Sequence, residues 1–223
     1  MDHALNQSLT GRSAAEADHR IANSLALLGG LVRHQAGAIG KSGKTLSPAE
    51  AHLLLDGIAA RISIVAQVHQ RIAKMPDGVI AFASHLREVC DGLIAAFSSQ
   101  QHPVHVEYRC QECLVPTKFV QPLTLIVNEM ILNALKYAHP AGVPLRLVIG
   151  CDVRNGALIL SIDDDGVGLP EGFDYKKDGD LGFRVIRSLC DELQATLDVQ
   201  SSDLGTSFEI VARGIPVANA QTA

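Results

Sequence analysis

Residues 128–138 read NEMILNALKYA, and residues 163–170 read DDDGVGLP. The first stretch predicts a strongly apolar helix with one polar stripe, because Glu129, Asn133 and Lys136 recur at i, i+4 and i+7. An acid, an amide and an amine on one helix face suit the binding of Mg²⁺ and phosphate oxygens. The same pattern also fits the polar edge of a half-buried helix, so the stripe alone leaves both interpretations open.

The acid–glycine stretch directly follows a predicted strand over residues 157–163. Gly166 and Gly168 permit close backbone approach, and an Asp at a strand end can accept a hydrogen bond from an exocyclic amine. A calcium loop or a plain acidic turn would also fit this composition. The calcium loop is disfavoured because Gly and Val occupy the later ligand positions and no Glu closes the site.

Two further glycine turns are weaker signals. Residues 179–186, GDLGFRVI, place glycines at the start of a predicted helix, and free N–H groups at a helix N-terminus attract phosphate. Residues 205–210, GTSFEI, form a turn of small residues that enters a strand.

The composition limits the class of protein. The chain has 223 residues, 47% of them apolar and 19% charged, with a formal net charge of −5. This balance argues against a nucleic-acid-binding protein, which is normally basic. We find no membrane span and no signal-peptide pattern, and we expect a cytoplasmic protein. The five cysteines lack the spacing of a zinc site, so reduced thiols are expected.

The first third of the chain predicts two long helices, which we assign to residues 1–78. The second helix begins with the capping signal Ser47-Pro48-Ala49-Glu50. The apolar positions expected to form the helix faces are Ile21, Leu25, Leu28, Val32, Ile58, Ile62, Val65 and Ile72. Because a helical hairpin cannot bury both apolar faces by itself, we expect a dimeric four-helix bundle.

Residues 79–223 mix helices and strands. Helices are predicted over 80–99, 122–138 and 181–193, and strands over 105–109, 145–153, 157–163, 196–201 and 207–211. Arg154-Asn155-Gly156 is a hairpin signal. The fold class is therefore α+β, with a helical hairpin followed by an α/β sandwich that has helices on one face of a mixed sheet.

An exposed histidine on the first helix is a candidate nucleophile. Glu16 and Asn23 share a helix face with His19, away from the apolar stripe. A carboxylate beside one ring nitrogen can fix the tautomer and leave the other nitrogen nucleophilic. An ordinary solvated helix face would show the same pattern.

Taken together and in this order, the motifs resemble those of bacterial sensor histidine kinases over nearly the whole chain. Residues 16–25 resemble the phosphoacceptor box of the subfamily with a His-Arg-x-x-Asn box, and residues 128–138 resemble the N box. Residues 164–168, 181–186 and 205–207 resemble the three glycine boxes. The second part is similar to the ATP-binding fold shared by gyrase, the Hsp90 chaperones, histidine kinases and MutL.

The resemblance implies roles for these residues. His19 would accept the phosphoryl group, with Glu16 or Asp18 as base and Asn23 orienting water in the reverse, phosphatase direction. Asp164 would bind the adenine amino group of ATP. Asn133 would hold Mg²⁺ together with Glu129, and the remaining nucleotide contacts would come from Lys136, Gly166, Gly168, Gly182 and Thr206.

We therefore expect a histidine kinase that autophosphorylates His19 from Mg-ATP and passes the phosphoryl group to an Asp on a response-regulator receiver domain. The expected partners are a second copy of the chain, the regulator and, because 18 residues precede His19, a separate sensor protein. The alternative is a non-catalytic histidine phosphotransfer protein with a degenerate ATP fold that relays phosphate between receiver domains. A third hypothesis is an anti-sigma-type serine kinase.

Overall fold

The structure is a computed structural model of the whole chain. It describes residues 45–72, 78–98, 103–139, 143–177, 179 and 181–219, together with scattered positions between 22 and 40. The chain divides into two compact units, Met1–Ala73 and Lys74–Ala223. Among the described helices, none combines the length and the apolar character that crossing a bilayer requires.

The N-terminal unit contains helix α2 (Pro48–Ile72), which begins at the predicted capping signal. Its buried face includes Val65, as predicted, but excludes Ile62, which was also predicted to be buried. Ile64, Val65 and Val68 are buried, whereas Ile62 is 50% exposed. β-Branched residues occur on both sides of this helix, so the 3.6-residue period could not by itself decide which side is covered.

The C-terminal unit is the predicted α+β sandwich. Its helices are α3 (Phe82–Phe97), α4 (Thr117–Tyr137) and α5 (Leu181–Glu192). Its strands are β1 (Val79–Ala81), β2 (Val104–Cys110), β3 (Cys113–Pro116), β4 (Leu145–Arg154), β5 (Ala157–Asp164), β6 (Ala195–Ser202), β7 (Gly205–Ala212) and β8 (Ala218–Asn219).

The main sheet of this unit has the strand order β2-β4-β5-β7-β6. Strands β2 and β4 pair in parallel, and the other neighbours are antiparallel, so the predicted mixed sheet is confirmed. The hairpin between β4 and β5 turns at Asn155 and Gly156, both with positive φ, as the sequence predicted. A smaller sheet pairs β3 with β1 and β8.

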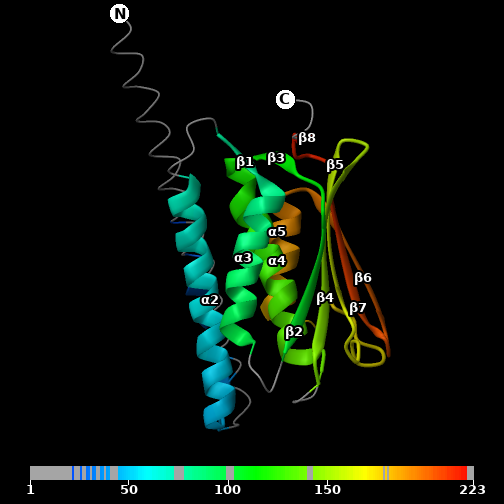
Figure 1. The fold of residues 1–223 in the computed structure, drawn as a ribbon. Helices are drawn as coiled ribbons and strands as arrows, with labels where there is room; N and C mark the ends of the chain where they lie inside the picture. The colour runs from blue at the N-terminus through cyan, green and yellow to red at the C-terminus, as the bar shows by residue number, and fades with distance from the viewer. Residues whose placement is uncertain are drawn as a thin grey trace, which may run out of the picture. The chain divides into compact units, whose positions relative to one another are not determined.

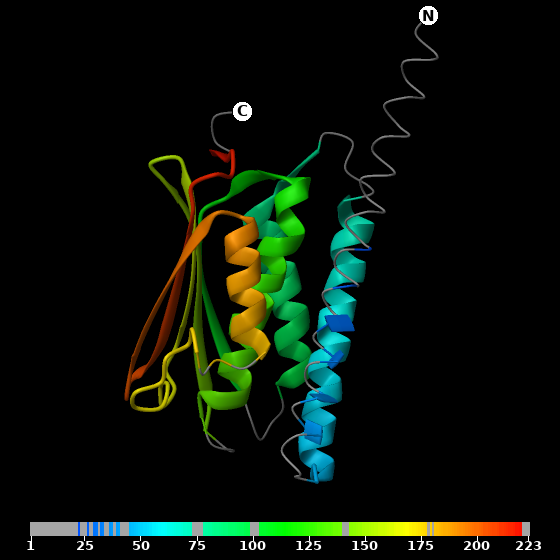
Figure 2. The same cartoon turned by 180° about the vertical axis from the view of Figure 1, so that it is seen from behind.

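Helices α3, α4 and α5 cover one face of the main sheet (Figures 1 and 2). Burial alternates along β4, where Leu145, Leu147 and Ile149 face the helices. Helix α4 lies in the middle of the layer and is buried along almost its whole length from Val120 to Ala134. Polar side chains on α4 are therefore held inside the unit.

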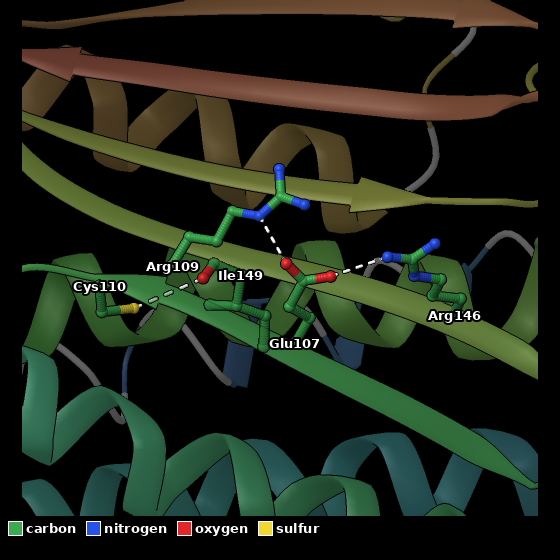
Figure 3. A network of polar contacts seen from close by, with 5 residues as sticks. All are labelled: Glu107, Arg109, Cys110, Arg146 and Ile149. Atoms are coloured by element: carbon green, nitrogen blue, oxygen red, sulfur yellow. Dashed lines mark hydrogen bonds and ion pairs between the residues drawn. The ribbon is translucent and has the colours of Figure 1, made fainter.

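The other face of the sheet carries charged side chains. Figure 3 shows Glu107 of β2 between Arg109 of the same strand and Arg146 of β4, at 2.7 and 2.8 Å. Hydrogen bonds from Arg109 and then Arg146 hold the pKa of Glu107 below its ordinary value. Such exposed pairs contribute little stability, but Arg146 also reaches the candidate site through its backbone.

Two helix starts differ from the sequence prediction, and the short strands β1 and β8 were not predicted. The helix predicted from residue 80 begins at Phe82, because the residues before it pair with β3 as β1. Helix α4 begins at Thr117, five residues before the predicted start, so Pro122 lies inside it. Strands as short as β1 and β8 depend on their partners, and no local pattern in the sequence identifies them.

Candidate functional site

Helix α4 carries the predicted polar stripe into the interior. Glu129 is fully buried, Asn133 is 9% exposed, and Lys136 is half-buried in the last turn. Burial of a carboxylate or an amide is unfavourable unless the group is bonded. Glu129 and Asn133 therefore lie in the interior of the unit, and only Lys136 lies at a half-buried edge of the helix.

Asn133 has an unused donor. Its side-chain Nδ2 is buried and has no hydrogen-bond partner among the described residues. Most buried polar groups in proteins are bonded, so an exception of this kind calls for a ligand, an ion or a water. The carboxamide oxygen on the same side chain is the kind of ligand that Mg²⁺ prefers.

Asp164 ends strand β5 and forms the centre of the second cluster. Its Oδ1 accepts hydrogen bonds from the backbone N–H groups of Gly166, at 2.9 Å, and Thr206, at 3.2 Å. Within the described part of the chain these bonds all end on Oδ1, which leaves Oδ2 as an acceptor. Burial raises the pKa of Asp164 above its ordinary value despite the two N–H donors.

The next residue, Asp165, holds the loop in place. Its Oδ1 accepts hydrogen bonds from the backbone N–H of Arg146 and from Nε2 of His139, both at 2.9 Å. Burial alone would raise its pKa, but these two donors hold the pKa of Asp165 below its ordinary value. The loop is thereby tied both to β4 and to the residues that follow α4.

Gly166 brings the two clusters together. A Cβ on Gly166 would lie 2.5 Å from backbone and side-chain atoms of Ala138, the residue that caps α4. The N–H of Val167 donates to the carbonyl oxygen of Ala138 at 2.7 Å. The structure therefore seats the acid–glycine loop on the end of α4 that carries Asn133, although the two segments are 30 residues apart.

The turn between β6 and β7 closes the loop from another side. A Cβ on Gly168 would lie 2.0 Å from the carbonyl oxygen of Ser202, and the hydroxyl of Ser201 accepts a hydrogen bond from Leu169. A Cβ on Gly205 would lie 1.9 Å from the carbonyl oxygen of Asp164. These approaches explain why the predicted glycine boxes need glycine.

The remaining predicted residues fall into two groups. Gly182 is buried in the first turn of α5, which packs against α4. The four residues of the predicted phosphoacceptor region, namely Glu16, Asp18, His19 and Asn23, lie outside the described residues.

Sequence reasoning missed the residues that support the site. His139 and Arg146 hold Asp165, and Ser201 and Ser202 hold the backbone around Gly168. No spacing rule connects them to the acid–glycine stretch, because their contacts arise from strand pairing and from the end of α4. The sequence signal that lies nearest to these supporting residues is the turn of small residues at the start of β7.

The assembled residues can bind a nucleotide. Oδ2 of Asp164 can accept a hydrogen bond from an amine. Gly166, Gly168 and Gly205 allow the backbone around Asp164 to pack closely against neighbouring segments. Asn133 supplies an amide at the other end of the cluster. These residues fit ATP with Mg²⁺ because they provide an amine acceptor and amide and carboxylate oxygens as ligands.

Gly156 and Gly168 have nearly equal positive φ angles but different surroundings. Replacing each by Ala therefore distinguishes the cost of backbone strain from the cost of a steric clash. Gly156 has a φ of +74° with nothing within 4 Å of an added Cβ, and Gly168 has a φ of +73° with Ser202 in contact. We expect Gly156→Ala to lower the free energy of unfolding by about 1 kcal/mol and Gly168→Ala by at least about 1 kcal/mol more. Urea unfolding of both variants measures the difference; equal effects would contradict the close approach to Ser202.

The raised pKa of Asp164 predicts a pH-dependent stability. The folded state favours protonated Asp164. The contribution of Asp164 to the free energy of unfolding of the wild type therefore falls as the pH rises through the folded-state pKa. Asp164→Asn removes the partly buried charge and keeps an oxygen for the two N–H groups. We expect the variant to be at least as stable as the wild type at pH 7.

Thermal unfolding between acid and neutral pH measures this prediction. The advantage of Asp164→Asn should vanish below about pH 3, where the carboxyl is protonated in both states. Asp198→Asn, on the exposed side of β6, is the matched control. A variant that loses stability relative to the wild type as the pH rises would show that the charge is favourable there.

Two protein-family models match the chain. The model described as histidine kinase matches residues 16–97, a range that contains His19. The model described as histidine kinase-, DNA gyrase B-, and HSP90-like ATPase matches residues 120–214, which contain Asn133 and Asp164.

Curated relatives carry related descriptions. The blue-light-activated histidine kinase 2 of Erythrobacter litoralis is 26% identical over 217 residues, which make up 95% of this chain and 59% of the relative. The sensor histidine kinase PdtaS of Mycobacterium tuberculosis is 27% identical over 208 residues, 91% of this chain and 39% of the relative. The chain thus spans less than two thirds of the length of these relatives.

Solved structures show the same fold. The Erythrobacter litoralis EL346 blue-light-activated histidine kinase matches with a TM-score of 0.70 at 24% identity, over 95% of this chain and 61% of the other. The histidine kinase domain of EL346 matches with a TM-score of 0.66 at 23% identity, over 89% of this chain and 95% of the other. The predicted fold class is confirmed.

Proposed function

Because this chain has a bacterial sensor histidine kinase core with an ATP-binding domain, we propose that it autophosphorylates His19 from Mg-ATP. The phosphoryl group would then pass to an Asp on the receiver domain of a response regulator. We place this activity in the cytoplasm, a reducing compartment that suits five cysteines without a disulfide. In this proposal residues 1–78 dimerise and carry the phosphoacceptor, and residues 79–223 bind ATP.

The observation that supports the proposal most strongly is the seating of the Asp164 loop on α4. Asp164 presents an acceptor for the adenine amine, and Asn133, whose Nδ2 has no partner among the described residues, lies on the helix that receives the loop. A protein that only relayed phosphate between receiver domains would need no residues for nucleotide binding. The arrangement therefore favours a kinase over the non-catalytic alternative.

The residues of the chain would divide the chemistry among them. Asp164 orients the adenine, and Asn133 with Glu129 would hold Mg²⁺, which neutralises charge on the phosphate oxygens when bound. Lys136 would meet the phosphates from the last turn of α4. His19 would attack the γ-phosphorus while ADP leaves and Glu16 or Asp18 takes the imidazole proton.

Labelled ATP tests the proposal directly. We expect purified protein with Mg²⁺ and γ-labelled ATP to acquire acid-labile, base-stable label, and we expect His19→Ala and Asp164→Asn to lose it. Asp164→Asn loses it because the amide would place N–H groups against the adenine amine. The measurement is label retained on the protein after acid and base treatment.

Matched controls come from the exposed surface of the sheet. His105→Ala on β2 and Asp198→Asn on β6 should keep the label, since both side chains are exposed and lie apart from the site. Acid-labile label on His19→Ala would rule out His19 as the acceptor. An unlabelled wild type that takes phosphate from a phosphorylated receiver domain would support the phosphotransfer alternative.

We also propose a homodimer formed through the N-terminal helices. Leu55 is 63% exposed and Ile62 is 50% exposed on α2, and residues seven apart lie on one helix face. Light scattering at micromolar concentration should give twice the chain mass, and Leu55→Lys with Ile62→Lys should give a monomer. Ala59→Lys, at an exposed position of the same helix, is the control; a monomeric wild type would contradict the proposal.

A further inference from the structure

A pocket is lined by residues of α5, of β6 and of the loop before α5. Strand β6 is the edge strand of the main sheet (Figure 1). The volume of the pocket is about 550 Å³, within the range of small-molecule sites. The lining residues are Tyr175, Lys176, Arg184, Arg187, Ser188, Cys190, Asp191, Ala195, Thr196 and Leu197. None of these residues belongs to the nucleotide site described above.

The lining is cationic. Three cationic residues, Lys176, Arg184 and Arg187, line the pocket together with one acidic residue, Asp191. The hydroxyls of Ser188 and Thr196 add further hydrogen-bond donors to the wall. A concave surface with an excess of positive charge concentrates anions.

Arg187 has a hydrogen-bond donor that nothing in the described chain uses. One terminal nitrogen of its guanidinium donates to the carbonyl oxygen of Lys176 at 2.5 Å, which fixes the side chain. Its Nε is buried and has no partner among the described residues. A buried charged N–H without an acceptor is costly, and an anion in the pocket would supply the missing oxygen.

The loop that leads to α5 closes one end of this space. Lys176 is held by Arg187 of α5, and the hydroxyl of Tyr175 donates to the carbonyl oxygen of Leu197 on β6 at 3.4 Å. The two contacts connect the loop to both walls. The rings and side chains of Tyr175, Leu197 and Ala195 give the pocket an apolar part beside its cationic part.

We propose that this pocket binds a small phosphate monoester, with its phosphate on Arg187 and its organic body against Tyr175 and Leu197. A phosphate is favoured over a carboxylate because Arg187, Lys176 and two hydroxyls offer more donors than two oxygens can accept. The volume exceeds that of a bare phosphate and leaves room for an attached body. This binding is separate from the proposed kinase activity and does not depend on it.

Nuclear magnetic resonance of the ¹⁵N-labelled full chain without Mg²⁺ tests the proposal, with ribose 5-phosphate as the probe. We expect the Nε–H signal of Arg187 to shift on titration and neutral ribose to leave it unmoved. Acetate should bind at least about tenfold more weakly than the phosphate ester. An Arg187 signal unmoved by ribose 5-phosphate, or equal affinity for acetate, would overturn the proposal.

Calorimetry of variants supplies the second measurement. Arg187→Lys keeps the charge but loses Nε, so it should weaken binding about tenfold or more. Arg154→Lys, an exposed pair with Asp152 on β4, is the matched control and should bind as the wild type does. Unchanged affinity in Arg187→Lys would overturn the proposal.

A third variant separates the two sites. Lys136→Gln alters the proposed nucleotide site and should leave ribose 5-phosphate binding intact; loss of binding there would show that the phosphate enters the nucleotide site instead. If Arg187→Lys fails to fold, Lys176→Gln with Lys118→Gln as control provides the same comparison at the other side of the pocket. Whichever variants fold, titration of the wild type with ribose 5-phosphate shows whether the phosphate ester contacts Arg187.

Discussion

The contact between the acid–glycine loop and the end of α4 is the constraint on which the site depends. The N–H of Val167 bonds to the carbonyl of Ala138, and Gly166 has no Cβ to hold the two segments apart. This contact brings the loop that begins at Asp164 to the end of α4, the helix that carries Asn133. Asp165 reinforces it through His139 and through the backbone of β4.

The same region gives up stability for binding. Burial raises the pKa of Asp164, and Asn133 keeps a buried donor without a partner in the described chain. A protein selected only for stability would replace such groups with apolar side chains. Their presence inside an apolar helix is easier to understand as the cost of an interior shaped for a polar ligand.

Helix α5 connects the nucleotide site with the proposed phosphate pocket. Its first turn contributes Gly182, and later turns contribute Arg184 and Arg187. The loop between the first two glycine motifs touches α5 at Arg187 and β6 at Leu197. In the two proposals one short helix would present glycine to the nucleotide and cationic groups to the phosphate ester.

The sequence by itself determined the fold class and the polar stripe on α4, because periodicity and turn composition act over a few residues. Tertiary structure decided what long-range pairing controls. Strand β1 replaced the predicted helix start, and α2 buried Ile64 while Ile62 stayed exposed. His139 and Arg187 became important only through partners 26 and 11 residues away in the chain. Contacts of that range depend on how the elements pack, which local patterns do not encode.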